Sequence, residues 1–214
     1  MFNRIAIICI VLPFIWGCGA EEPAPEIVYN YPGSSGGFRM PSPTPTVPLP
    51  KPTVTAPESW QPLAWAEKGW TAVIIHHSAT RTGNAAIFDS WHREGNHWEG
   101  VGYDFVIGNG TDSKDGQVEV TYRWRYQKVG AHCGGTPNNW ANKEGVGICL
   151  VGDFNRTTPT RAQLQSLVKL VSFLQDRFNI QTSRIYGHGS TPGGHTTDCP
   201  GKRFPMAELK SSLD

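Results

Sequence analysis

Charged residues are scarce in this 214-residue chain, and neither sign dominates. Lys and Arg number 19 against 18 Asp and Glu, so the formal net charge is +1 and charged residues make up only 17% of the sequence. A protein that grips the phosphates of nucleic acid needs a strongly basic surface, which this balance does not supply. The composition therefore argues against nucleic-acid binding, and it also provides no acidic tail.

The chain also lacks an apolar run long enough to span a bilayer comfortably. Its longest run, from Ile5 to Trp16, follows a short basic start that contains Arg4. A spanning helix needs about 20 predominantly apolar residues, and this run is much shorter. A basic start followed by a short apolar core is typical of a secretion signal.

The residues that close this apolar run predict a lipid anchor. Ile15-Trp16-Gly17-Cys18 resembles the cleavage box of bacterial lipoproteins, in which the cysteine becomes the lipidated first residue. Trp16 departs from that box, where a small residue is usual, and an ordinary signal peptide cleaved near Ala20 is the alternative. Acyl chains on Cys18 would anchor the protein stably, since each buried methylene contributes about 0.8 kcal/mol. We expect a protein of the cell envelope that faces the periplasm, with the outer membrane as its anchor.

Proline is concentrated in one segment. Ala20 to Ser59 holds ten of the seventeen prolines and has no sustained apolar period. Such a segment cannot bury enough surface to fold and is typical of a tether. We divide the chain into a signal peptide over 1–18, a disordered tether over 19–59 and one folded domain over 60–214.

The folded part alternates strand and helix patterns. Strands are predicted over 71–75, 102–107, 117–122, 147–151 and 184–187. Helices are predicted over 84–96 and from either Thr158-Pro159, with an N-terminal proline, or Thr160, which with Gln163 would form a capping box. The second helix carries a stripe predicted to be buried, made of Leu164, Leu167, Val168, Val171 and Leu174. This order indicates one α/β domain with a central mixed sheet flanked by helices.

Two distant segments hold candidate zinc ligands. Ile74-Ile75-His76-His77-Ser78-Ala79-Thr80 follows a predicted strand, and Gly187-His188 leads to Thr197-Asp198-Cys199-Pro200-Gly201. Imidazole and thiolate are ligands that zinc prefers, but this spacing matches no short finger pattern. Taken with VGYDFVI, GAH and GVGICLVGDF, in this order, the segments make the chain similar to the N-acetylmuramoyl-L-alanine amidases over roughly Lys68 to Pro205. That family includes the phage T7-type lysozymes and the peptidoglycan recognition proteins.

The resemblance implies a peptidoglycan recognition protein-like fold and a zinc site. Its metal ligands correspond here to His76, His188 and Cys199, and its catalytic pair to Tyr103 and Thr197. The loop before Cys199 departs from the family, because it is longer than in the shorter members and contains His195, a rival ligand.

Histidines, cysteines and tryptophans outside the ligand set are further candidates. His132 in GAH matches a loop histidine at the cleft, and His77 should face away from the metal because strand side chains alternate; both are expected to contact substrate. If Cys199 binds zinc, Cys133 and Cys149 are left either as a disulfide or as two buried thiols. The tryptophans offer possible sugar-stacking faces, and the sequence does not choose among them.

The resemblance implies zinc-dependent hydrolysis of the amide between N-acetylmuramic acid and L-alanine. The expected partners are peptidoglycan or muropeptides, with no nucleic acid, and the expected state is a monomer. Two alternatives stay open: a module that binds peptidoglycan without cutting it, and a zinc peptidase that acts on the stem peptide. Members that only recognise peptidoglycan typically lack the cysteine, so Cys199 favours catalysis.

Overall fold

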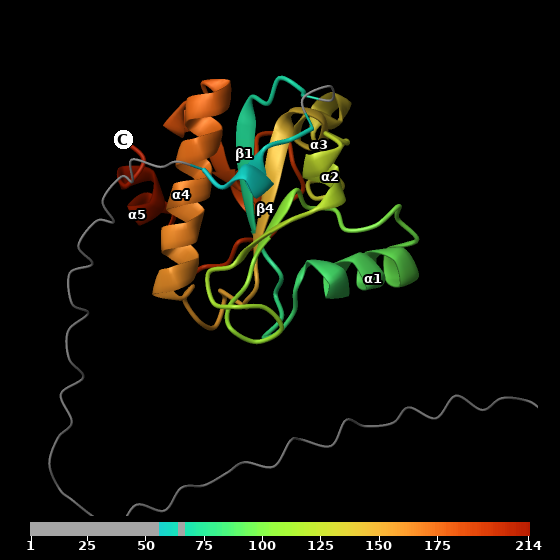
Figure 1. Ribbon diagram of the computed structural model, residues 1–214, viewed down its shortest axis with the longest axis vertical. Coiled ribbons are helices and arrows are strands. Elements are labelled where there is room, and N and C mark those ends of the chain that lie inside the picture. The colour runs from blue at the N-terminus through green and yellow to red at the C-terminus, as the bar shows by residue number, and fades with distance from the viewer. Residues whose placement is uncertain (1–55, 64–66) are drawn as a thin grey trace, which may run out of the picture. The chain divides into compact units, whose positions relative to one another are not determined.

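The computed structural model describes residues 56–63 and 67–214, which belong to one compact unit (Figure 1). The expected signal peptide, Cys18 and nearly all of the expected tether lie outside the described residues. Within the described part, no helix combines the length and the apolar character that a membrane span requires.

A five-stranded mixed sheet forms the centre of the domain, with strand order β3-β2-β4-β1-β5. The strands are β1 (Ala72–His77), β2 (Phe105–Ile107), β3 (Val118–Val120), β4 (Gly145–Leu150) and β5 (Ile185–Gly187). Only the β2–β3 pair is antiparallel. Every residue of β1 and β4 is buried, as expected of parallel strands covered on both faces.

Helices cover the two faces of the sheet (Figure 1). The long helix α4 (Arg161–Phe178) packs on one face, and α1 (Ala85–Asn96) and the short α3 (Trp140–Glu144) lie on the other. The remaining helices are α2 (Tyr122–Arg125), α5 (Met206–Ser211) and the 3-10 turns η1 (Glu58–Trp60), η3 (Pro137–Asn139), η4 (Thr182–Arg184) and η5 (His188–Ser190). This arrangement confirms the predicted α/β class.

Alternation along β1 divides its side chains between the two faces. Val73 and Ile75 join the main core under α4, whereas Ala72 and Ile74 face α3. His76 lies on the same face as Ala72 and Ile74, and His77 lies on the same face as Val73 and Ile75. The two histidines therefore point to opposite sides of the sheet, as the strand period predicts.

The chain enters this core at η1. Trp60 is buried against Phe173 of α4, with ring centroids 5.8 Å apart, and its carbonyl accepts a hydrogen bond from the Trp124 indole. Ala56 also packs against the same core. Ordered packing therefore begins a few residues before Trp60.

Two expectations about the elements were wrong in detail. Tyr122 begins α2 instead of ending a strand, because the Thr121 side chain caps that helix by accepting from the Arg123 N–H. Leu164 is only partly buried, because the buried position in that turn belongs to Gln163.

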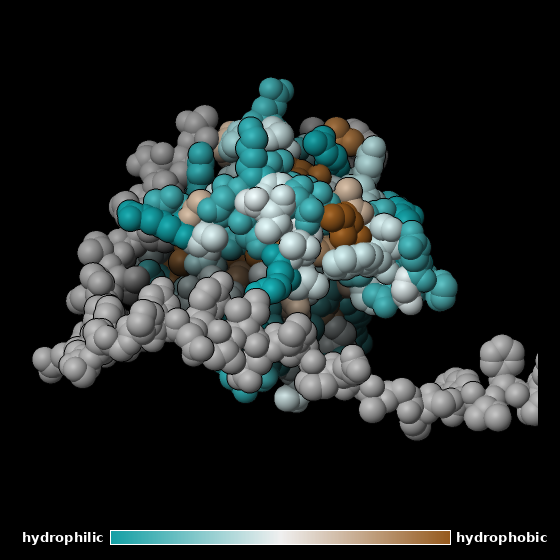
Figure 2. All heavy atoms as spheres, turned by 90° about the horizontal axis from the view of Figure 1, so that it is seen from below, coloured by the Kyte–Doolittle hydropathy of each residue, from teal (hydrophilic) through white to brown (hydrophobic). Residues whose placement is uncertain are grey.

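Hydrophilic and neutral residues cover most of the face seen in Figure 2, and the hydrophobic areas on it are small and separate. Large exposed apolar side chains among the described residues are Leu63, Trp91, Trp98, Tyr126 and Val129. Of these, Trp98 lies at the candidate site.

Candidate metal centre

Three side chains of the types that bind zinc meet at the carboxyl end of β1. His76 belongs to β1, His188 directly follows β5, and Cys199 lies in the loop before α5. The strands β1 and β5 are parallel neighbours with Ile75 opposite Gly187, so both histidines emerge at the same place. One ligand atom from each of the three residues lies within 4.8 Å of the other two.

The donor set and its geometry fit a zinc ion. His76 Nδ1 is 3.7 Å from Cys199 Sγ, and the rings of His76 and His188 have centroids 4.7 Å apart. Bonds of about 2.0 Å to nitrogen and 2.3 Å to sulfur at tetrahedral angles place two ligand atoms about 3.5 Å apart. The Nε2 atom of His188 is buried and has no hydrogen-bond partner in the described part of the chain. Three protein ligands leave a fourth position open, as in catalytic zinc sites.

The environment keeps the two histidines neutral. Burial lowers the pKa of His76 well below its ordinary value, and the neighbouring histidines lower it further. Burial also lowers the pKa of His188. Neutral imidazole is the form that ligates a metal, so both rings are ready for one.

Unlike the two histidines, the Cys199 side chain is not held in the form that binds a metal. Burial raises the pKa of its thiol to about 12, although the His77 backbone N–H donates to Sγ at 3.4 Å and works in the opposite direction. The thiolate form therefore requires a cation beside it. A divalent metal would supply that charge and displace the thiol proton.

Tyr103 lies against the histidines, with its ring centroid 5.2 Å from that of His76. Burial raises the pKa of its hydroxyl well above the ordinary value, and its contact with the Cys149 thiol acts in the same direction. The hydroxyl therefore keeps its proton and can donate it in a hydrogen bond.

Thr197 lines the same cleft, and its hydroxyl already has a partner. Its Oγ1 accepts a hydrogen bond from the Cys199 backbone N–H at 3.2 Å. This contact shapes the loop that presents the thiol, which favours a structuring role for Thr197.

The two histidines expected to contact substrate are both occupied by the protein. The Nδ1 atom of His77 accepts from the Phe154 N–H at 3.0 Å, on the far side of the sheet. His132 lies behind His76, with Nδ1 3.1 Å from His76 Nε2 and Nε2 3.3 Å from the Gly145 carbonyl. Each residue is 7% exposed. The Nδ1 atom of His77 and both ring nitrogens of His132 thus have partners within the protein, while both residues line the cleft.

A cleft of about 330 Å³ surrounds the candidate centre. Trp98 is the tryptophan that lines it and is 42% exposed; its ring is tilted against that of His92, with centroids 5.0 Å apart. Trp124, in contrast, is fully buried in the core. His195 lies against Gly134 and Gly135 and is not one of the three clustered residues.

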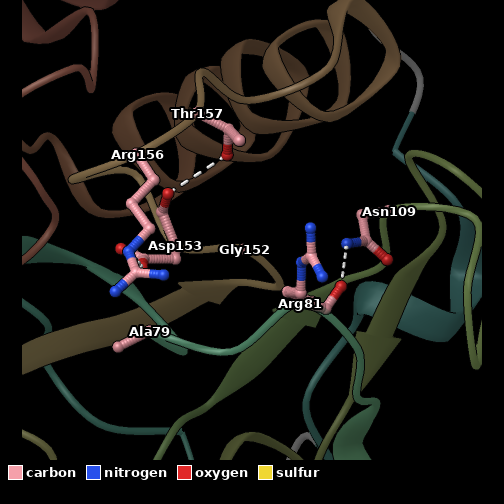
Figure 3. A pocket seen from close by; sticks show the side chains of 7 residues that line it. All are labelled: Ala79, Arg81, Asn109, Gly152, Asp153, Arg156 and Thr157. Atoms are coloured by element: carbon pink, nitrogen blue, oxygen red, sulfur yellow. Dashed lines mark hydrogen bonds and ion pairs between the residues drawn. The ribbon is translucent and has the colours of Figure 1, made fainter. Parts of the chain in front are cut away.

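A second hollow, of about 460 Å³, adjoins this cleft, and Ala79 lines both (Figure 3). Figure 3 shows the Arg81 and Arg156 side chains at this hollow, with Asn109 beside Arg81. Arg156 is 3.3 Å from Asp153, and the Asn109 amide donates to the Arg81 carbonyl at 2.9 Å. The hollow is therefore polar, and a guanidinium group stands on each side of it.

Cys133 and Cys149 are free thiols. Cys133 packs with Ile74 and Ala141, whereas Cys149 packs with Phe88 and Val106. The two cysteines belong to different clusters, so of the two alternatives that the sequence left open the structure has the buried thiols.

A mixed α/β sheet with a His-His-Cys cluster and an open fourth position defines a protein with a candidate zinc-hydrolase centre. Residues 66–202 of the chain match the family model described as N-acetylmuramoyl-L-alanine amidase. This match covers more than half of the sequence. The chain therefore belongs to the N-acetylmuramoyl-L-alanine amidase family, as its motifs predict.

Similar proteins support the family and the fold. Peptidoglycan-recognition protein SC2 of Drosophila melanogaster is 32% identical over 137 residues, which cover 60% of this chain and 66% of that protein, just under two thirds of its length. The amidase LysC from Clostridium intestinale URNW superposes with a TM-score of 0.57 and 28% identity, covering 72% of this chain and 91% of that one. Bumblebee PGRP-SA gives a TM-score of 0.54 and 25% identity, covering 68% and 83%.

Proposed function

We propose that the chain is a zinc-dependent amidase that hydrolyses the bond between N-acetylmuramic acid and L-alanine in peptidoglycan. The observation that carries this proposal is the cluster of His76, His188 and Cys199, open to a cleft that Tyr103 also lines. Membership of the amidase family supports the reaction class.

In this proposal His76, His188 and Cys199 hold the metal. Zinc bound there supplies a Lewis acid that polarises the amide carbonyl and lowers the pKa of a water molecule. The Tyr103 hydroxyl donates to the carbonyl oxygen as negative charge develops on it, and its raised pKa keeps the proton in place for that bond. Thr197 holds the Cys199 loop in shape and is close enough to the cleft to contact the substrate.

The two arms of the substrate differ in charge, and so do the two ends of the cleft. The sugar arm is neutral and suits the exposed face of Trp98. The stem peptide carries carboxylates, which suit the guanidinium groups of Arg81 and Arg156 at the adjoining hollow (Figure 3). We therefore orient the disaccharide towards Trp98 and the peptide towards the two arginines.

A second candidate function is binding of peptidoglycan without cleavage, because several similar proteins are named for peptidoglycan recognition. The complete zinc-type donor set argues against it. Cys199 in particular places its Sγ 3.7 Å from His76 Nδ1, where a thiolate would complete the ligand set.

Digestion of purified muropeptides by residues 56–214, followed by mass spectrometry, tests the proposal. The wild-type domain should separate the disaccharide from an intact stem peptide, and Cys199→Ser should lose both zinc and activity. Cys133→Ser is the matched control, because it changes a buried thiol outside the cluster and should keep both. Products cut within the stem would favour a peptidase, and uncut muropeptide that stays bound would favour a binding module.

A further inference from the structure

His132 is held rigidly behind the candidate metal ligand His76. The Asn142 side-chain oxygen accepts from the backbone N–H groups of His132 and Cys133, at 2.8 and 2.9 Å. The Asn142 amide in turn donates to the Cys133 carbonyl at 3.0 Å. One buried side chain thus fixes the backbone on both sides of the His132 peptide.

Two glycines make room for the His132 ring. A Cβ atom on Gly147 of β4, or on Gly130 in the preceding loop, would overlap the imidazole. The ring therefore lies directly against the strand, in a place that side chains at these positions would fill. Such close packing leaves the imidazole little freedom to turn.

The hydrogen bonds of the ring can run in only one direction. The Gly145 carbonyl can accept but not donate, so the proton of His132 is on Nε2. A neutral imidazole carries a single ring proton, so with that proton on Nε2 the Nδ1 atom of His132 is an acceptor. The Nε2 of His76, 3.1 Å away, must then be the donor.

This direction decides which nitrogen of His76 is available to a metal. With its proton on Nε2, neutral His76 has a free lone pair on Nδ1. That atom is the one that lies 3.7 Å from Cys199 Sγ, on the side of the ligand cluster. The opposite tautomer would direct an N–H at the metal position and prevent binding.

We propose that His132 is a positioning residue, which accepts the Nε2 proton of His76 and so presents His76 Nδ1 to the metal. The role rests on the proposed zinc centre, and it replaces the contact with substrate that the sequence suggested. Metal-bound histidines generally donate their second ring N–H to a carboxylate, a carbonyl or water, and the loss of such a partner typically weakens metal affinity by roughly 10- to 100-fold. Here a second imidazole, backed by a strand carbonyl, is the partner.

Three variants separate this role from simple packing. His132→Leu fills the site without an acceptor, and His132→Asn keeps an acceptor oxygen on Cγ, where the imidazole carries Nδ1. His92→Leu is the matched control, because His92 lines the same cleft and contacts Gly102, Trp98 and Tyr103. Zinc affinity is measured by competition with a chromophoric chelator, and thermal melting verifies that each variant folds.

We expect zinc binding to weaken by roughly 10- to 100-fold in His132→Leu, to stay within about threefold of wild type in His132→Asn, and to be unchanged in His92→Leu. An affinity in His132→Leu equal to that of the wild type would overturn the positioning role while leaving the amidase proposal intact.

Ring 15N NMR of the metal-free protein provides a readout that needs neither zinc nor activity. The wild type should carry the Nε2–H tautomer on both His76 and His132, and His76 in His132→Leu should become a mixture of tautomers. A His76 proton on Nδ1 in the wild type would overturn the inference. A wild-type domain that binds no zinc would remove the proposed function, and the tautomers would still test the hydrogen-bond chain.

Discussion

Tyr103 and Thr197 face the same cleft, yet their hydroxyl groups are engaged differently. The Tyr103 hydroxyl contacts a cysteine thiol and keeps its proton, whereas the Thr197 hydroxyl accepts the Cys199 N–H. We therefore expect Tyr103→Phe to keep zinc and to lower turnover by about 100-fold, as for the loss of one oxyanion donor. Steady-state kinetics with zinc content measured in parallel checks this expectation.

Thr197→Ala is the comparison for that measurement. Thr197→Ala should lower turnover less than Tyr103→Phe does, because the Thr197 hydroxyl holds the Cys199 loop in shape. Unchanged turnover in Tyr103→Phe would assign Tyr103 to packing, and a larger loss in Thr197→Ala would reverse the order of the two roles.

Asp104 is a fully buried carboxyl beside the site. One oxygen accepts from the Gly147 N–H at 2.8 Å and the other has no partner in the described part of the chain. Burial raises its pKa from 3.8 to about 7, a change that corresponds to roughly 4 kcal/mol. The fold favours the protonated form, so this contribution is complete below about pH 4 and is lost as the pH rises through about 7.

Asp104→Asn, which resembles the protonated carboxyl, should flatten the dependence of stability on pH between about 4 and 7. Thermal melting across that range measures the effect. Asp176→Asn changes an exposed carboxyl of α4 and should keep the wild-type slope. A slope that persists in Asp104→Asn would assign the pH dependence to other groups.

At the scale of single residues, the sequence predicts which residues belong to the candidate site better than it predicts the contacts between them. His76, His188 and Cys199 could be named because each stands in a family motif, and the structure brings them together. The bond between His76 and His132 joins positions 56 residues apart and depends on two glycines that have no local signature. Arg81 and Arg156 were missed for a similar reason, because charged residues in loops are ordinarily solvated.

In helix α4 the sequence predicts the N-terminal cap but not the tertiary contacts of the capping residue. Thr160 and Gln163 form the capping box that their spacing predicts. The Gln163 amide also donates to the carbonyls of Ile107 and Val151, at the ends of β2 and β4. This polar residue is buried at the turn because its amide bridges two strand ends, and the apolar stripe alone does not indicate such a contact.

Gln163→Met should therefore destabilise the domain by roughly 1–3 kcal/mol, since it removes the side-chain donor to the Val151 carbonyl and one of two donors to the Ile107 carbonyl. Urea unfolding measures the change. Gln165→Met alters an exposed glutamine of the same helix and should stay within about 0.5 kcal/mol of wild type. Equal stability of the two variants would mean that water replaces the Gln163 amide.

At the scale of the whole molecule, one prediction concerns the lipid anchor, whose residues lie outside the described part. The lipoprotein-like box ending at Cys18 predicts that the full chain takes up a fatty-acid label in a Gram-negative host and fractionates with membranes. Cys18→Ala should take up no label, and it should be released or stay as an uncleaved precursor. A wild-type chain without label and soluble in the periplasm would mean that Trp16 prevents recognition of the box.

That result would leave the amidase proposal untouched, because all its residues lie between His76 and Cys199. The class of fold was predictable from the alternation of strand and helix patterns. The order β3-β2-β4-β1-β5 was not, because local patterns do not specify which strands are neighbours.

This strand order determines when the candidate metal ligands can come together during synthesis of the chain. β1 lies between β4 and β5, so the first long strand to leave the ribosome has no neighbour until much later segments follow it. His76 must wait for Cys199, 123 residues further along the chain. Contacts of such long range form late in folding. A growing chain therefore lacks a complete ligand set until Cys199 has been synthesised, and a molecule cut short before Cys199 would lack one of the three candidate ligands.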